Sequence, residues 1–331
     1  MNSCTRVFSV AIMLLAGWGP SLAQEGTEPD KRIGILLAAG DITACYHKER
    51  KYKEVAELIQ REVDKAAGLP VAVLVLGDVA YSNRDKKGKL AAPFYAECFE
   101  EFKTLWGTAH YNRLLPVAGN HDYSDDPTKS VYQEYFQERF TALNADKATQ
   151  FYAMTFPQDN ADGWLLAAVN FYRDRNLQEG LLRTALTNSK AKCALVFSHP
   201  FLMSSGEHGR DEPNWTYAKM EPFMKIAIEQ GATLLVTAHD HDYERFARQD
   251  AAGNEMAGGL GSFVAGTGGA HLYGVPDDKR HPLSRAFQNT SAGLLKLELY
   301  PDSYTSSFVA IDGTVHDAQT VPQDCSKRPG L

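Results

Sequence analysis

Short apolar runs alternate with amphipathic segments along most of this chain. Five runs of five to seven residues are rich in Val, Ile, Leu and Ala, and each ends in a polar cluster. They cover residues 33–39, 71–76, 114–118, 193–197 and 233–238. Apolar runs of this length and composition predict strands that are buried on both faces.

Segments with a helical period lie between these runs. In 52–67, apolar residues recur every three or four positions, and Gly68-Leu69-Pro70 follows as a stop signal. Further helices are predicted at 94–106, 130–143, 177–187 and 222–229, and a closing hairpin at 293–299 and 303–310. Alternation of strands and helices predicts an α/β layered fold.

The polar clusters that follow the strands contain groups able to bind metals. In layered α/β folds, chemistry gathers on the loops at the carboxyl ends of the strands. Carboxylates, imidazoles and an amide oxygen form a mixed O/N donor set suited to divalent or trivalent transition metals. Because the set exceeds what one tetrahedral zinc ion needs, it indicates two metals about 3.5–4 Å apart. Its members are Asp41, Asp78, Asn120, His199, His239 and His241.

The order of these clusters resembles the five sequence blocks of the calcineurin-like metallophosphoesterases. The blocks are Gly-Asp, Gly-Asp-x-x-Tyr, Gly-Asn-His-Asp, Val-x-x-His and His-x-His. Most of that superfamily places a metal-binding His two residues after the first Asp, where this chain has Thr43. Tyr81 instead follows Asp78 by three residues, as in the purple acid phosphatases, where a tyrosinate binds ferric iron. The narrower resemblance is therefore to that group.

The resemblance implies a role for each matched residue. Asp41, Tyr81 and His241 would hold Fe(III), and Asp78 would bridge to the second metal. Asn120, His199 and His239 would hold that second metal, a divalent Fe, Zn or Mn ion. The catalytic residues would be His121, which contacts the phosphate, and His208, which assists the leaving group.

Two further stretches extend the resemblance over residues 33–310. They are His239-Asp240-His241-Asp242-Tyr243-Glu244-Arg245 and Gly266-Thr267-Gly268-Gly269. The implied fold is an α/β layered β-sandwich flanked by helices, with the metal site at the carboxyl ends of strands. Thr43, and Ala238 in place of the Gly before His239, depart from the family pattern and raise the question of local backbone geometry.

The first 23 residues have the pattern of a cleaved secretory signal, so export to the periplasm or the exterior is expected, with 24–331 as one catalytic domain. No later run is long enough for a membrane anchor.

Four cysteines remain after removal of the signal and allow three full pairings. Cys45–Cys98 is the favoured bridge. Cys193, inside an apolar run, is expected to be a buried free thiol.

Net charge and motifs narrow the substrate class. The 331 residues carry a formal charge of −7 without a basic run, which argues against a nucleic-acid polymer as partner. Neither a P-loop nor a G-x-S-x-G motif is present.

The main hypothesis is a dimetal hydrolase of small phosphate monoesters, in which a metal-bound hydroxide attacks phosphorus in line. Alternatives are a phosphodiesterase or nucleotidase with a Mn or Zn pair, and a secreted metal- or phosphate-binding protein without turnover; the sequence leaves the oligomeric state open.

Overall fold

The computed structural model describes residues 1, 31–211, 213–275, 279–319 and 323–329, and only the backbone of residues 210, 211 and 213–218. Lys31–Leu331 form one compact unit. The predicted signal at 1–23 lies outside the described residues, apart from Met1. No helix in the described part of the chain is long and apolar enough to cross a membrane.

Two seven-stranded sheets form the centre of this unit. The first has the order β15 (Val315–His316), β14 (Ser303–Ala310), β13 (Gly293–Leu299), β1 (Gly34–Ala39), β2 (Val71–Val75) and β5 (Leu114–Pro116), with β16 (Gln323–Asp324) paired to β14. The second has the order β12 (Ser284–Gln288), β10 (Tyr243–Phe246), β11 (Gly261–Ala265), β9 (Leu234–Thr237), β8 (Ala194–Phe197), β7 (Trp164–Ala168) and β6 (Tyr152–Phe156). A small hairpin pairs β3 (Asn83–Arg84) with β4 (Leu90–Ala91).

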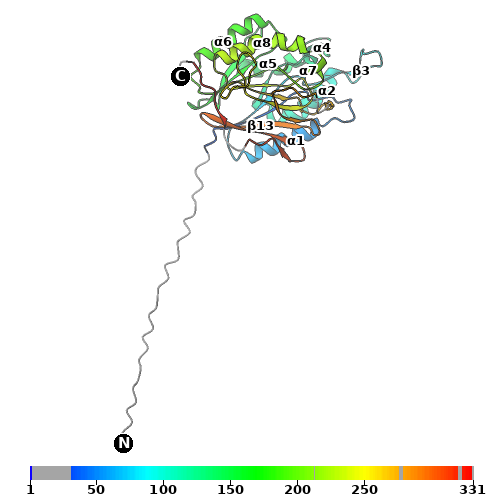
Figure 1. The fold of residues 1–331 in the computed structure, drawn as a ribbon. Coiled ribbons are helices and arrows are strands. Elements are labelled where there is room, and N and C mark those ends of the chain that lie inside the picture. Colours follow the sequence, from blue (N-terminus) through cyan, green and yellow to red (C-terminus); the bar gives the residue numbers. More distant parts are fainter. Residues whose placement is uncertain (2–30, 212, 276–278, 320–322, 330–331) are drawn as a thin grey trace. The chain divides into compact units, whose positions relative to one another are not determined.

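Alternation along the strands explains the layering. In β8, Leu195 and Phe197 join the core between the sheets, whereas Ala194 and Val196 join a second core. That second core contains the buried faces of α6 (Arg175–Asn188) and α8 (Pro213–Glu229), which lie together on one side of the unit, with α1 and β13 on the other (Figure 1). Helices therefore cover a β-sandwich, as the resemblance implied.

The helices that pack against the first sheet belong to the same continuous apolar cluster as the residues between the sheets. They are α1 (Tyr52–Lys65), α2 (Tyr95–Phe102), which continues into a π-helical turn (Lys103–Gly107), and α5 (Val131–Ala142). Shorter helical pieces are α3 (Thr108–His110), a 3-10 turn (Tyr111–Arg113), α4 (His121–Ser124) and α7 (Glu207–Asp211).

All five predicted strands are confirmed, and so is the closing hairpin. The predicted helix 222–229 was too short, because α8 begins at Pro213 and carries Pro222 in its interior. A proline removes one helical hydrogen bond. Burial of the neighbouring Met220, Phe223 and Met224 offsets that loss.

Both disulfides join distant parts of the chain. Cys45–Cys98 is confirmed, but the expectation that Cys193 is a free thiol was wrong, because Cys193 pairs with Cys325. The C-terminal segment returns to the amino end of β8, where the backbone N–H of Cys325 donates to the carbonyl of Asp302 at 2.9 Å. The apolar run around Cys193 contains no sequence signal for pairing with a residue so distant in the chain.

Candidate metal centre

The predicted ligands lie where strands of the two sheets end. The backbone N–H of Gly40, after β1, donates to the carbonyl of Ala265 at the end of β11, so the sheets meet at this edge. Asp41, Asp78 and His239 have left-handed φ values of 59°, 47° and 78°. Three non-glycine residues in this sparsely populated region at one edge indicate strain held for a functional purpose.

One group of donors contains Asp41, Tyr81 and His241. The hydroxyl of Tyr81 donates to Oδ1 of Asp41 at 2.8 Å and lies 3.2 Å from Nε2 of His241. That Nε2 lies 3.4 Å from Oδ1 of Asp41. All three side chains are buried. A carboxylate, a phenol and an imidazole thus direct their polar atoms to one point.

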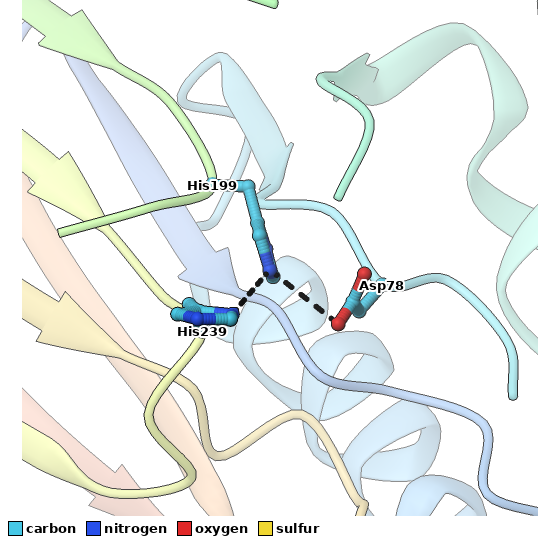
Figure 2. A group of neighbouring side chains, drawn as sticks. All are labelled: Asp78, His199 and His239. Atoms are coloured by element: carbon cyan, nitrogen blue, oxygen red, sulfur yellow. Dashed lines mark hydrogen bonds and ion pairs between the residues drawn. The ribbon is translucent and has the colours of Figure 1, made fainter. Parts of the chain in front are cut away.

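The second group contains Asp78, Asn120, His199 and His239. Nε2 of His199 lies 3.1 Å from Oδ1 of Asn120, 3.1 Å from Nδ1 of His239 and 3.4 Å from Oδ2 of Asp78. Figure 2 shows Asp78 and the two imidazoles turned toward one another. Their candidate ligand atoms all lie within 4.8 Å of each other, a spacing that could hold one metal ion.

Backbone carbonyls fix the orientation of two of these imidazoles. Nδ1 of His199 donates to the carbonyl of Leu76 at 2.7 Å, and Nδ1 of His241 donates to that of His271 at 2.7 Å. Each Nε2 therefore faces the cluster and carries a lone pair when its imidazole is neutral. This is how metal-binding histidines are normally positioned, so the residues present fit a metal.

The charges of the second group depend on one another. Burial raises the pKa of Asp78, but His199 and His121 outweigh it and hold the pKa below its ordinary value. Burial lowers the pKa of His239, and His199 and His208 lower it further. Asp78 is therefore ionised and His239 neutral, which are the forms that bind metals. Burial lowers the pKa of His199, but Asp78 outweighs this effect and raises the pKa to about 9, so a metal would displace a proton from this imidazole.

The two groups touch through the loop of His239. Its backbone N–H donates to Oδ2 of Asp41 at 2.8 Å, while the backbone N–H of His121 donates to Oδ1 of Asp78 at 2.8 Å. All seven predicted ligands are thus brought to one edge of the sandwich. Asp78, expected as the bridge between two metals, lies with the donors expected for the second metal.

His121 lies outside both donor groups. Its Nδ1 is 2.8 Å from Oδ2 of Asp125, which is buried and also receives a hydrogen bond from Arg84 at 2.6 Å. Burial lowers the pKa of His121, but the carboxylates of Asp78 and Asp125 overcome this effect and raise it. The ring is 27% exposed, so a cationic imidazole can face a bound anion.

His208 reaches the same edge from α7. Its ring stacks on that of His239, with centroids 4.5 Å apart and planes at 21°. Buried Asp240 fixes this segment, because its carboxylate accepts from the backbone N–H groups of His208 and Gly209 at 2.9 and 3.1 Å. Sequence reasoning assigned Asp240 no role.

Other members of the His-x-His-x-Tyr-Glu-Arg block hold the surrounding loops. Glu244 accepts from the backbone N–H and hydroxyl of Ser205 at 2.8 and 2.5 Å. Asp317 accepts two hydrogen bonds from Arg245, both at 2.6 Å, and one from Tyr243 at 2.9 Å. The block therefore ties the metal loop to the segment of His208 and to the first sheet.

The two departures from the family pattern leave the geometry intact. Thr43 forms an isolated parallel bridge with Ala80, and its carbonyl accepts from the backbone N–H of Tyr81 at 3.2 Å. Ala238 has an ordinary negative φ and is fully buried against Gly40, where a Cβ at Gly40 would collide with it. Gly40, not Ala238, is the residue that must lack a side chain here.

Two tyrosines at the edge were missed. Tyr172 directs its hydroxyl to Oδ1 of Asn120 at 3.4 Å, and Tyr273 directs its hydroxyl to Nε2 of His241 at 3.3 Å. Tyr172 follows β7, an apolar run at 164–168 that ends in polar residues and could have been recognised as a further strand. Tyr273 lies in a loop without any periodic signal.

Comparisons with known proteins find related sequences. The model of the calcineurin-like phosphoesterase family matches residues 35–243. Purple acid phosphatase 17 of Arabidopsis thaliana is 28% identical over 163 residues, which cover 44% of this chain and 46% of that protein. The chain thus spans about half the length of this relative.

Solved structures share the fold. A purple acid phosphatase from yellow lupin (Lupinus luteus) seeds superposes with a TM-score of 0.66 at 16% identity, over 86% of this chain and 53% of its own. GAP50, described as the anchor in the inner membrane complex of Plasmodium, superposes with a TM-score of 0.57 at 13% identity, over 89% and 90%. At these identities the likeness concerns the fold alone.

Proposed function

This chain belongs to the calcineurin-like phosphoesterase family, and we propose that it hydrolyses phosphate monoesters at a metal pair of the purple acid phosphatase type. The observation that carries the proposal is the position of Tyr81. Its hydroxyl joins a carboxylate and an imidazole, Asp41 and His241, beside a second donor group built on His199 and His239. A phenol in the first group favours a hard trivalent ion such as Fe(III), and the second group suits divalent Fe, Zn or Mn.

When bound, such a pair neutralises phosphate charge and lowers the pKa of coordinated water. The protein's own residues position the other participants. His121, held by Asp125, faces the site as a donor to the phosphate and stabilises negative charge on it as the reaction proceeds. The proposal assigns His208, which stacks on His239, to protonation of the departing alkoxide.

Metal analysis together with an absorption spectrum tests this assignment. The purified protein should contain two metal ions per chain and show a visible tyrosinate-to-iron band. A colourless protein loaded with Mn or Zn would refute the iron assignment and leave metal-dependent hydrolysis standing. A metal-free protein without hydrolysis would refute both.

Substitution within the donor groups provides the second test. Asp78→Asn and His199→Ala should each abolish metal loading and hydrolysis together, because each removes a ligand from the group whose spacing could hold one metal ion. Unchanged hydrolysis in either variant would contradict the proposed site. Glu57→Gln, on the exposed face of α1, is a control that should keep the metal content of the wild-type protein.

The substrate class follows from rates on two esters. A monoesterase should hydrolyse p-nitrophenyl phosphate far faster than bis-(p-nitrophenyl) phosphate, whereas the reverse ratio would make the chain a diesterase. A fold does not fix function, and one structural neighbour is described as an anchor. Binding of phosphate without turnover would therefore identify this chain as a binding protein.

We also propose that the chain is exported. The two disulfides support this, since such bonds persist in oxidising compartments. N-terminal sequencing of the mature protein should find Gln24 as its first residue.

A further inference from the structure

Tyr273 has an unusual position over the first donor group. Its ring is parallel to that of His241, with centroids 4.1 Å apart and planes at 9°. It also meets the ring of His208 edge-on at 5.6 Å. The residue is half-buried and thus open to solvent at the candidate metal centre.

The stacking determines where the hydroxyl lies. Parallel rings come no closer than about 3.5 Å, the van der Waals separation of carbon atoms. Because the Tyr273 hydroxyl is 3.3 Å from Nε2 of His241, it lies above the face of the imidazole and not in its plane. A cation binds an imidazole along the in-plane lone pair, so this hydroxyl faces the side of such a cation and is not its ligand.

Tyr81 has the opposite geometry. Its ring is roughly perpendicular to that of His241, at 71°, and its hydroxyl already donates to Asp41. The two phenols that approach the same Nε2 therefore have different functions: Tyr81 belongs to the donor set and Tyr273 does not.

Nε2 of His241 is a poorly aligned acceptor for the Tyr273 hydroxyl. Nδ1 of His241 donates to the carbonyl of His271, so the Nε2 lone pair lies in the plane of the imidazole, whereas the hydroxyl lies above that plane. A cation on Nε2 would take up the lone pair and leave the hydroxyl able to donate to a group bound beside the cation. A half-buried donor is stabilised by a well-aligned acceptor on its open side.

We propose that Tyr273 contacts the substrate, donating its hydrogen bond to a non-bridging oxygen of the phosphate group bound beside His241. The inference rests on the proposed function and adds a binding residue to it. An anionic phosphate oxygen is the stronger acceptor at this position, since hydrogen bonds to charged groups exceed those between neutral ones.

Tyr273→Phe in the metal-loaded full chain tests the proposal, because Phe keeps the ring that stacks on His241. Inorganic phosphate is the probe. Its dissociation constant is measured from the change it causes in the visible band, and its inhibition constant from competition with a phosphate monoester. Loss of one charge-assisted hydrogen bond should raise the phosphate dissociation constant and KM by about ten- to a hundredfold. Metal content and band intensity should stay unchanged.

Matched variants separate the outcomes. Tyr81→Phe should remove the visible band, and Tyr304→Phe, at a buried ring of the first sheet, should leave phosphate binding unchanged. Unchanged phosphate affinity in Tyr273→Phe would overturn the proposal, and so would loss of metal or of band intensity, which would make Tyr273 a ligand. A wild-type protein that binds phosphate without hydrolysis would refute the proposed function and still permit this comparison.

Discussion

Gly119 lies directly against the carboxylate of Asp78. A Cβ at Gly119 would overlap Oδ1 and the backbone nitrogen of Asp78, although the φ of Gly119 is not positive. Gly119→Ala should therefore displace Asp78, weaken metal binding at least about tenfold and lower the free energy of unfolding by about 1–3 kcal/mol. Metal content after dialysis and urea unfolding measure the two effects.

The control for this substitution is Gly180→Ala. Gly180 lies within α6, with open space where the methyl group would be. That variant should gain about 0.5–1 kcal/mol in stability and keep its metals. Equal metal affinity in Gly119→Ala and wild type would contradict the placement of Asp78 in the site.

Single residues were predictable where a strand led to them. The sequence places Asp41, Asp78, Asn120, His199 and His239 after apolar runs, and the structure brings them into contact. Metal binding itself stays a prediction. Tyr273 could not be found in this way, because only tertiary structure stacks its loop on His241.

At the scale of elements, Glu62 joins α1 to β13. Oε1 lies 2.7 Å from Nζ of Lys65, and Oε2 lies 3.1 Å from Nζ of Lys296. Burial raises the pKa of this carboxyl, but the two lysines outweigh that effect and lower it. A folded-state pKa below the unfolded one stabilises the protein at neutral pH, and this stabilisation is lost as pH falls through the folded pKa.

Glu62→Gln should therefore destabilise the protein by about 1–2 kcal/mol at pH 7. The difference from wild type should shrink as pH falls below the ordinary value of 4.5 and through the lower folded-state pKa, where Glu62 becomes protonated in the folded wild-type protein as well. Urea unfolding at several pH values measures it. Glu57→Gln, exposed on the same helix, should stay within about 0.5 kcal/mol at every pH, and a pH-independent loss in Glu62→Gln would disprove the electrostatic explanation.

Elements were predictable when a local pattern determined them. The hairpin of β13 and β14 has the predicted bounds, because alternating burial gives each strand a clear signal. β6 and β11 were missed, since short runs among polar turns resemble loops. The start of α8 was missed because tertiary burial keeps the helix continuous through Pro222.

The arrangement of the whole molecule depends on contacts that no local pattern contains. The five predicted strands divide between two sheets, with β1, β2 and β5 in one and β8 and β9 in the other. The α/β layering was predictable from alternation, and the sandwich only from the resemblance. Neither indicated that the C-terminal segment returns to β8 through Cys325.

The bridge that fixes this return should stabilise the fold without affecting the metal centre. The Cys193–Cys325 bridge closes a loop with a sequence separation of 132, and Cys193 lies just before the amino end of β8, whereas His199 follows its carboxyl end. The Cys193→Ala/Cys325→Ala double variant should lose about 3–5 kcal/mol of unfolding free energy, mainly because its unfolded chain gains freedom. Its metal content and kcat at 25 °C should match those of the wild type.

The Cys45→Ala/Cys98→Ala double variant is the informative comparison. Cys45 lies four residues after Asp41, on the loop whose segment around Thr43 pairs with that of Tyr81. Its bridge closes a shorter loop, with a separation of 53, so the entropic loss should be somewhat smaller. Metal affinity should nevertheless fall in this variant, because the loop that carries Asp41 loses its anchor to α2. Urea unfolding and metal titration of both variants test these two roles. If the Cys193–Cys325 variant lost metal and the Cys45–Cys98 variant kept it, the Cys45–Cys98 bridge would not be the one that supports the metal loop.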